Sequence, residues 1–162
     1  MLNPKSPLAA LMNAPVRPGR VTWIGLRPQR RARMQVVDSA RLTTSAGLIG
    51  DRYSGRSGER HVTLIQAEHL VAIAAFLGLD AVAPDQLRRN IVVAGLNLLA
   101  LKERPFRLGS ARLEMTGECH PCSRMEEILG PGGYNAVRGH GGITARVLED
   151  GQVSLGDPIG VA

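Results

Sequence analysis

Two cysteines separated by two residues, Cys119 and Cys122, are the first candidates for chemistry. Such a pair can be a redox dithiol whose thiolate exchanges disulfides. The pair can bind zinc together with a histidine such as His120 or His140. One thiolate can instead hold a soft metal such as molybdenum at the mouth of a cofactor pocket. Both cysteines can also be small buried apolar residues without a chemical role.

The surrounding sequence favours the soft-metal interpretation. A redox dithiol is expected in a thioredoxin-like βαβ context, which is missing here, and a structural zinc site usually shows two paired half-sites, of which one is visible. Cys122 falls near the start of a helix expected over 121–129, and helix N-termini stabilise thiolates and bind anions. Arg124 follows two residues later. Cys122 is therefore the predicted metal ligand and catalytic residue.

Two further segments, apart from the cysteines in sequence, predict an anion site. Arg88, Arg89 and Asn90 precede an apolar strand and can hold a phosphate, because arginine makes bidentate contacts. They can equally be a solvated charge pair. The segment 138–142 contains His140 between glycines, and its backbone amides can bind an anion or simply turn the chain.

The glycine-punctuated segment 41–60 is predicted to be a long functional loop. It holds Arg52 beside Asp51 and leads into His61. Arg52 can face an anion or pair with Asp51, and a lone histidine is more often a satisfied surface or core residue than a ligand. We carry both Arg52 and His61 forward as cofactor-binding candidates.

The elements that must position these residues are mostly short strands. Residues 66–77 form the clearest helix, with Ala67, Leu70, Val71, Ala74 and Leu77 on one face and Gly78 as the stop. Turns recur every eight to twelve residues, which predicts a mainly β, barrel-like fold with one long helix and short helical insertions. Residues 1–19, rich in proline, are expected to be a tail or arm, and 20–162 a single domain. Strands are expected at 21–26, 33–37, 61–65, 90–93, 107–108, 111–116, 143–148, 153–155 and 159–161.

Charge and composition narrow the class of partner. The net charge of the 162 residues is +6, which favours an anionic partner. Nucleic acid is the least favoured, because the chain offers two Phe, two Tyr and one Trp for stacking on bases. A phosphorylated small molecule suits the charge as well. No apolar run is long enough to cross a membrane and two cysteines make no disulfide framework, so a cytoplasmic location without a membrane partner is expected.

Four segments in order resemble the MOSC family, the C-terminal domains of molybdenum cofactor sulfurases. The resemblance runs from about residue 20 to the C-terminus and lies in short motifs. These are Gly47-Leu48-Ile49-Gly50-Asp51-Arg52 followed by Arg60-His61-Val62-Thr63-Leu64; Leu87-Arg88-Arg89-Asn90-Ile91-Val92-Val93; Thr116-Gly117-Glu118-Cys119-His120-Pro121-Cys122-Ser123-Arg124; and Gly141-Gly142-Ile143-Thr144-Ala145-Arg146-Val147 followed by Gly156-Asp157-Pro158-Ile159.

The resemblance implies a β-barrel-like fold that binds the molybdenum cofactor, a molybdopterin. Relatives include the mitochondrial amidoxime-reducing component and bacterial proteins that reduce N-hydroxylated bases. The cysteine that ligates molybdenum in them matches Cys122, and residues near the pterin phosphate match Arg88 and Asn90. The family's pattern also places Arg52, Arg124 and His140 among the cofactor-binding residues.

Two functions follow as expectations. In the first, the chain is an oxidoreductase that takes oxygen from an N-hydroxylated or related small-molecule substrate, with electrons from an external donor. In the second, it carries sulfur as a persulfide on Cys122 from a sulfur-donor protein, or delivers the cofactor, without turnover of its own. Larger relatives have an additional N-terminal MOSC region, which residues 1–19 cannot replace.

Overall fold

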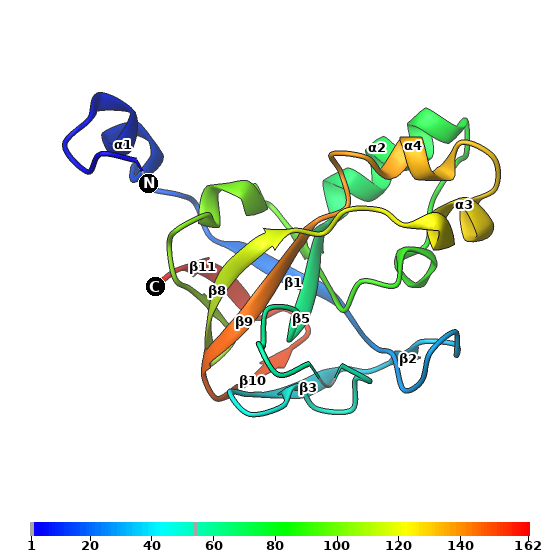
Figure 1. Ribbon diagram of the computed structural model, residues 1–162, viewed down its shortest axis with the longest axis horizontal. Coiled ribbons are helices and arrows are strands. Elements are labelled where there is room, and N and C mark those ends of the chain that lie inside the picture. Colours follow the sequence, from blue (N-terminus) through cyan, green and yellow to red (C-terminus); the bar gives the residue numbers. More distant parts are fainter. Residues whose placement is uncertain (1, 54) are drawn as a thin grey trace.

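A closed barrel of seven strands forms the centre of the molecule (Figure 1). The computed structural model describes residues 2–53 and 55–162. Around the barrel the strands follow the order β1-β11-β7-β8-β9-β5-β6 and return to β1. Their bounds are β1 Gly19–Leu26, β5 Val62–Gln66, β6 Ile91–Ala94, β7 Phe106–Leu108, β8 Ala111–Glu118, β9 Ile143–Glu149 and β11 Pro158–Val161.

Every neighbouring pair in the barrel is antiparallel except β5 and β6. A parallel pair needs a crossover connection, and here the crossover is α2 (Ala67–Leu77) followed by η1 (Pro84–Leu87). Register shifts within β8–β9 and β1–β6 bend the strands, as bulges do at the curved parts of barrels. The predicted mainly β barrel with one longer helix and short helical insertions is confirmed.

Two apolar cores hold the elements together. The barrel interior contains Phe106, Leu113 and Ile24, all fully buried. A second core lies outside the barrel, where Ile65 and Val92 of β5 and β6 face the helices. That second core anchors α2, α3 (Ser123–Leu129) and α4 (Gly133–Val137), which lie together beyond one end of the barrel in Figure 1.

A small three-stranded sheet covers another part of the barrel. It pairs β10 (Gly151–Ser154) with β3 (Ser39–Thr43), and β3 with β4 (Gly47–Leu48). The expectation of one long loop over 41–60 is therefore wrong in its first part, which contains most of β3 and all of β4. The two-residue β4 is too short to show a sequence periodicity. The remaining short elements are β2 (Gln35–Val36), η2 (Leu98–Leu101) and α1 (Pro7–Met12).

The helix predicted over 66–77 is present as α2, which begins one residue later, and its buried face differs from the predicted one. Gly78 ends it in the left-handed conformation, at φ 67°. Its buried residues are Leu70, Ile73 and Ala74, whereas Val71 is 71% exposed. The buried stripe is rotated toward Ile73 because the helix packs on the β5–β6 surface and on α4.

The N-terminal segment extends away from the barrel. Figure 1 shows α1 at a distance from the strands. Arg104 fixes the start of the connection, since its guanidinium donates to the carbonyls of Met12 and Ala14 at 3.1 Å each. The domain's first strand begins at Gly19. Within the described residues, no helix has the length and apolar character required to span a bilayer.

Candidate functional site

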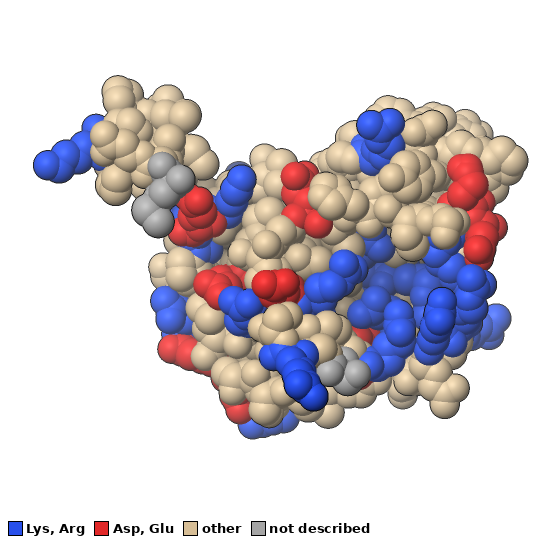
Figure 2. Space-filling model, in the orientation of Figure 1, with Lys and Arg blue, Asp and Glu red and all other residues tan. Residues whose placement is uncertain are grey.

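An arginine-lined pocket of about 520 Å³ lies where several strands begin or end. The chain leaves the barrel through β1 and β8 here, and enters it through β5 and β6. Figure 2 shows the resulting concentration of basic side chains below α3. The lining residues are Arg27, Arg30, Arg31, Arg52, Arg60, Arg88, Arg89, Glu118, His120, Pro121, Cys122, Ser123, Arg124 and Met125.

The two cysteines have different environments. Cys122 is exposed, lines the pocket, and is the N-cap residue of α3, where its carbonyl accepts from the Met125 amide at 2.9 Å. Cys119 is only 3% exposed, and its Sγ lies 3.9 Å from a guanidinium nitrogen of Arg60. Only the Cys122 thiol is therefore available to a ligand from solvent.

A buried arginine holds the cysteine segment in place. The Arg89 guanidinium donates to the carbonyls of Gly141 at 2.7 Å, Leu87 at 2.9 Å and Cys119 at 3.3 Å. The Cys119 amide donates to the Gly142 carbonyl at 2.8 Å. The glycine segment thus offers carbonyls to Arg89 and Cys119. Burial lowers the pKa of Arg89, while the nearby cysteine thiols act in the opposite direction.

A buried carboxylate orients the arginine that follows β1. The side chain of Asp51 is fully buried, and its carboxylate accepts from Arg27 at Nε (3.1 Å), at Nη2 (2.9 Å) and at the backbone amide (2.8 Å). Asn90 donates to the same carboxylate at 3.0 Å. Burial acts to raise the pKa of Asp51, but the hydrogen bonds and charge of Arg27 outweigh it, so the pKa lies below its ordinary value.

Asn90 is a structural member of this network. Its side chain is fully buried, and its Oδ1 accepts from the amide and hydroxyl of Thr63 at 3.1 Å each. Its Nδ2 donates to the Gly25 carbonyl as well as to Asp51. These four bonds occupy the Asn90 side chain, which does not line the pocket. Asn90 therefore acts on the pocket indirectly, by holding Asp51, which orients Arg27.

Arg88 faces other cations. Its backbone is left-handed, at φ 57°, and one guanidinium nitrogen donates to the Ala32 carbonyl at 2.7 Å. Burial, followed by the positive charges of Arg124, Arg27 and Arg52, lowers the pKa of Arg88. The positive charges that lower the pKa of Arg88 also repel its guanidinium, and a bound anion would relieve that repulsion.

Glu127 compensates part of this charge at the pocket's edge. It accepts from Arg124 at 3.0 Å and from Arg31 at 3.2 Å. Both ion pairs are exposed to solvent, which screens them, so they contribute little to stability. Their effect is to hold two arginines of different segments side by side.

The two histidine candidates lie outside this pocket. His61 is 5% exposed; its Nδ1 accepts from the Val147 amide at 3.1 Å and its ring meets Tyr53 edge-on. Burial and then the charge of Arg146 lower the pKa of His61. His140 packs against His69 at 5.0 Å between ring centroids. Of the predicted residues, the structure gathers Cys122, Arg52, Arg88 and Arg124 around one pocket.

The MOSC domain family model matches residues 50–160. The chain belongs to the MOSC domain family. This family is associated with molybdenum-cofactor-dependent redox enzymes. No curated protein matches the chain.

Solved structures share the fold of this MOSC domain at low sequence identity. YuaD from Bacillus subtilis superposes with a TM-score of 0.75 at 20% identity, covering 89% of this chain and 95% of that one. YiiM from Geobacillus stearothermophilus has a TM-score of 0.71 at 16% identity, covering 89% and 75%. YiiM from Escherichia coli has a TM-score of 0.68 at 21% identity, covering 88% and 69%. These likenesses establish the architecture.

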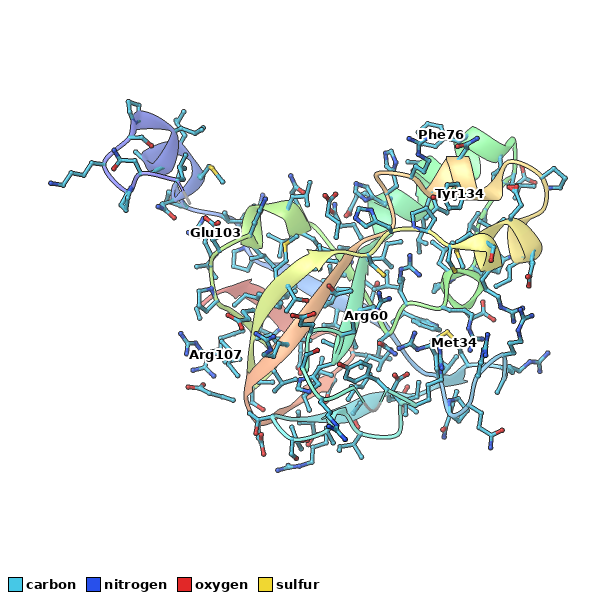
Figure 3. All side chains as sticks on the ribbon, in the orientation of Figure 1. Met34, Arg60, Phe76, Glu103, Arg107 and Tyr134 are labelled. Carbon is cyan, nitrogen blue, oxygen red and sulfur yellow. The ribbon has the colours of Figure 1, made fainter. Side chains whose placement is uncertain are left out.

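Sequence reasoning did not carry forward five of the eight arginines of the MOSC pocket as site residues: Arg27, Arg30, Arg31, Arg60 and Arg89. The cluster Arg27-Pro28-Gln29-Arg30-Arg31 was a visible signal of positive charge. Arg60, labelled in Figure 3, is the first residue of the motif Arg60-His61-Val62-Thr63-Leu64 that leads into β5. Arg89 lay within the predicted phosphate motif, yet its side chain turns inward to three carbonyls.

Proposed function

We propose that this MOSC domain binds the molybdenum cofactor with Cys122 as the metal ligand and reduces N-hydroxylated or related small molecules. The observation that carries the proposal is one exposed thiol in the wall of a pocket lined by eight arginines. A thiolate suits a soft metal, and guanidiniums suit a phosphate.

The donor set fits a metal that brings its own ligands. Among the described residues, no three His, Cys, Asp or Glu side chains are grouped so that they could hold a metal ion. That finding disfavours zinc bound by the cysteine pair and a histidine. One thiolate beside an anion-binding wall is instead what a pterin-held metal requires, because the cofactor supplies the remaining sulfur ligands. In this proposal Arg88 and Arg124 bind the pterin phosphate.

The bound cofactor would supply two-electron redox chemistry. Reduction of R–NH–OH to R–NH₂ breaks the N–O bond, consumes two electrons and two protons, and releases water. The electrons come from an external donor. The protein residues hold the ligands in place and deliver the protons. Glu118 and His120 line the pocket and flank Cys119 in sequence. In this proposal His120 delivers a proton from a ring nitrogen and Glu118 from a carboxyl oxygen.

Metal content after mutation tests the proposal. We expect Cys122→Ala to abolish molybdenum retention in protein made in a host that synthesises the cofactor. Cys119→Ala is the matched control and should retain most of the metal, because Cys119 is buried. Equal molybdenum content in the two variants would contradict the assignment of Cys122.

Exposure of Cys122 also supports a second candidate, a sulfur carrier. A sulfur-donor protein can reach the Cys122 thiol, whereas Cys119 is buried. The outer sulfur of the donor's persulfide would form a bond to the Cys122 sulfur, the donor's S–S bond would break, and the donor would take up the thiol proton. The carrier form would be about 32 Da heavier on Cys122, as expected for a persulfide. Intact-protein mass spectrometry after isolation without reductant tests this candidate, and an unmodified mass in molybdenum-free protein would contradict it.

A further inference from the structure

A second cavity of about 360 Å³ adjoins the Cys122 pocket. Arg27, Arg52 and Arg60 line both cavities. The second cavity adds Tyr53 and Gly55 to its lining and contains neither cysteine. The positive wall therefore continues beyond the space next to the proposed metal ligand.

The positive charge exceeds what one phosphate and one thiolate would neutralise. Eight guanidiniums line the Cys122 pocket. Three carboxylates oppose them: Glu118 in the wall, Asp51 on Arg27, and Glu127 shared by Arg31 and Arg124. Five positive charges remain. A Cys122 thiolate and one phosphate with about two negative charges leave roughly two of them.

Part of the unopposed charge lies at the boundary between the two cavities. Arg27 is neutralised by Asp51. Among the described residues, no carboxylate forms an ion pair with Arg52 or Arg60. The Arg52 amide donates to the Arg27 carbonyl at 2.7 Å, which ties the backbone carrying Arg52 to the oriented Arg27. Arg52 and Arg60 are both exposed, and six further arginines line the Cys122 pocket beside them.

We propose that Arg52 and Arg60 bind a second phosphate, carried by the substrate, so that the substrates of this MOSC domain are phosphorylated small molecules. The inference rests on the proposed function for the Cys122 pocket and adds the substrate class. The substrate phosphate occupies the adjoining cavity, and the group to be reduced points toward Cys122. A nucleoside monophosphate has the required chemistry, whereas the parent nucleoside lacks the anchoring group.

The test measures binding of adenosine monophosphate and adenosine to the purified full chain by calorimetry. Arg60→Gln should weaken adenosine monophosphate binding about 10- to 100-fold, as expected for losing hydrogen bonds to a charged group. Arg52→Gln should act in the same direction and guards against a local folding defect in the first variant. Arg41→Gln is the matched control, since Arg41 is an exposed arginine of β3 outside both cavities.

The outcomes separate this inference from the proposed function. Cys122→Ala should lose molybdenum yet retain adenosine monophosphate binding, while Arg60→Gln should do the reverse. Unchanged nucleotide affinity in both arginine variants, or equal binding of adenosine, would overturn the inference. Joint loss of molybdenum and nucleotide in Arg60→Gln would also overturn it, because the arginine would then bind the cofactor's phosphate. The second phosphate could also come from the cofactor itself, and mass spectrometry of the extracted cofactor tests this. A dinucleotide form of the cofactor would carry that phosphate and would overturn the substrate assignment.

Discussion

Replacing Asp51 should destabilise the fold more than any surface charge substitution. Asp51→Ala leaves Arg27, whose side chain is 14% exposed, without its carboxylate partner. Breaking a buried ion pair by removing one partner costs about 3–5 kcal/mol. The urea denaturation slope is about 2 kcal/mol per molar for a small protein, so the unfolding midpoint should fall by roughly 1.5–2.5 M.

Asp51→Asn preserves the shape and removes the charge. It should cost about 1.5–3 kcal/mol, the value of hydrogen bonds to charged groups. Asp80→Asn is the matched control, because Asp80 is exposed. Urea melts followed by circular dichroism at pH 7 measure all three variants. A midpoint for Asp51→Ala equal to that of Asp80→Asn would refute the argument that Asp51 orients Arg27 by a buried ion pair.

The same carboxylate makes stability depend on acid pH. The pKa of Asp51 is lower in the folded protein than its ordinary value of 3.8. Its contribution is therefore fully present above about pH 3.8 and is lost as the pH falls from there through the lower folded pKa. The wild type should lose this contribution on acidification, and Asp51→Asn should lack that part of the pH dependence. Parallel acid limbs for the two proteins would contradict the lowered pKa.

Three further outcomes are expected. Iodoacetamide should alkylate Cys122 rapidly and Cys119 only on unfolding, as peptide mass spectrometry would show, because only Cys122 is exposed; equal labelling of both in folded protein would contradict the buried position. Phe106→Ala should cost about 3–5 kcal/mol in urea melts because it empties a fully buried site in the barrel, and a loss below 1 kcal/mol would contradict that packing. Gly142→Ala should lower stability and soluble yield, since Gly142 has φ 87° and an added Cβ would collide with the Leu64 carbonyl; wild-type melting would contradict the clash.

Local sequence patterns were sufficient to predict most elements of the barrel. The strand over 111–116 alternates apolar and polar residues, and Gly78 marks the end of α2 at the residue where the chain becomes left-handed. Sequence patterns did not predict which apolar residues of a helix are buried, because tertiary packing determines it. Val71 and Ile73 are both apolar helix residues, and only contact with the barrel surface determines that Ile73 is the buried one.

The pocket could be predicted only in part. Cys122, Arg88 and Arg124 carry local signals, so their sequence neighbourhoods were informative. The pairing of Arg27 with Asp51 joins residues 24 positions apart, and the contact of Arg89 with Gly141 joins residues 52 apart. No local pattern predicts such contacts, because barrel closure brings those segments together. The same limit explains why His61 looked like a ligand candidate although its ring nitrogen accepts from the Val147 amide.

The closing pair of strands has a consequence for synthesis of the protein. The barrel is sealed by β1 against β11, with Gly19 opposite Ile159. A contact between residues so far apart in sequence is slow to form, and it cannot form on the ribosome until residues near 159 have left the exit tunnel. Before that moment the nascent chain is a sheet with two open edges. Those edges are β1 and β7, the two partners of β11, and their unpaired backbone groups can pair with another chain until β11 fills the gap between them.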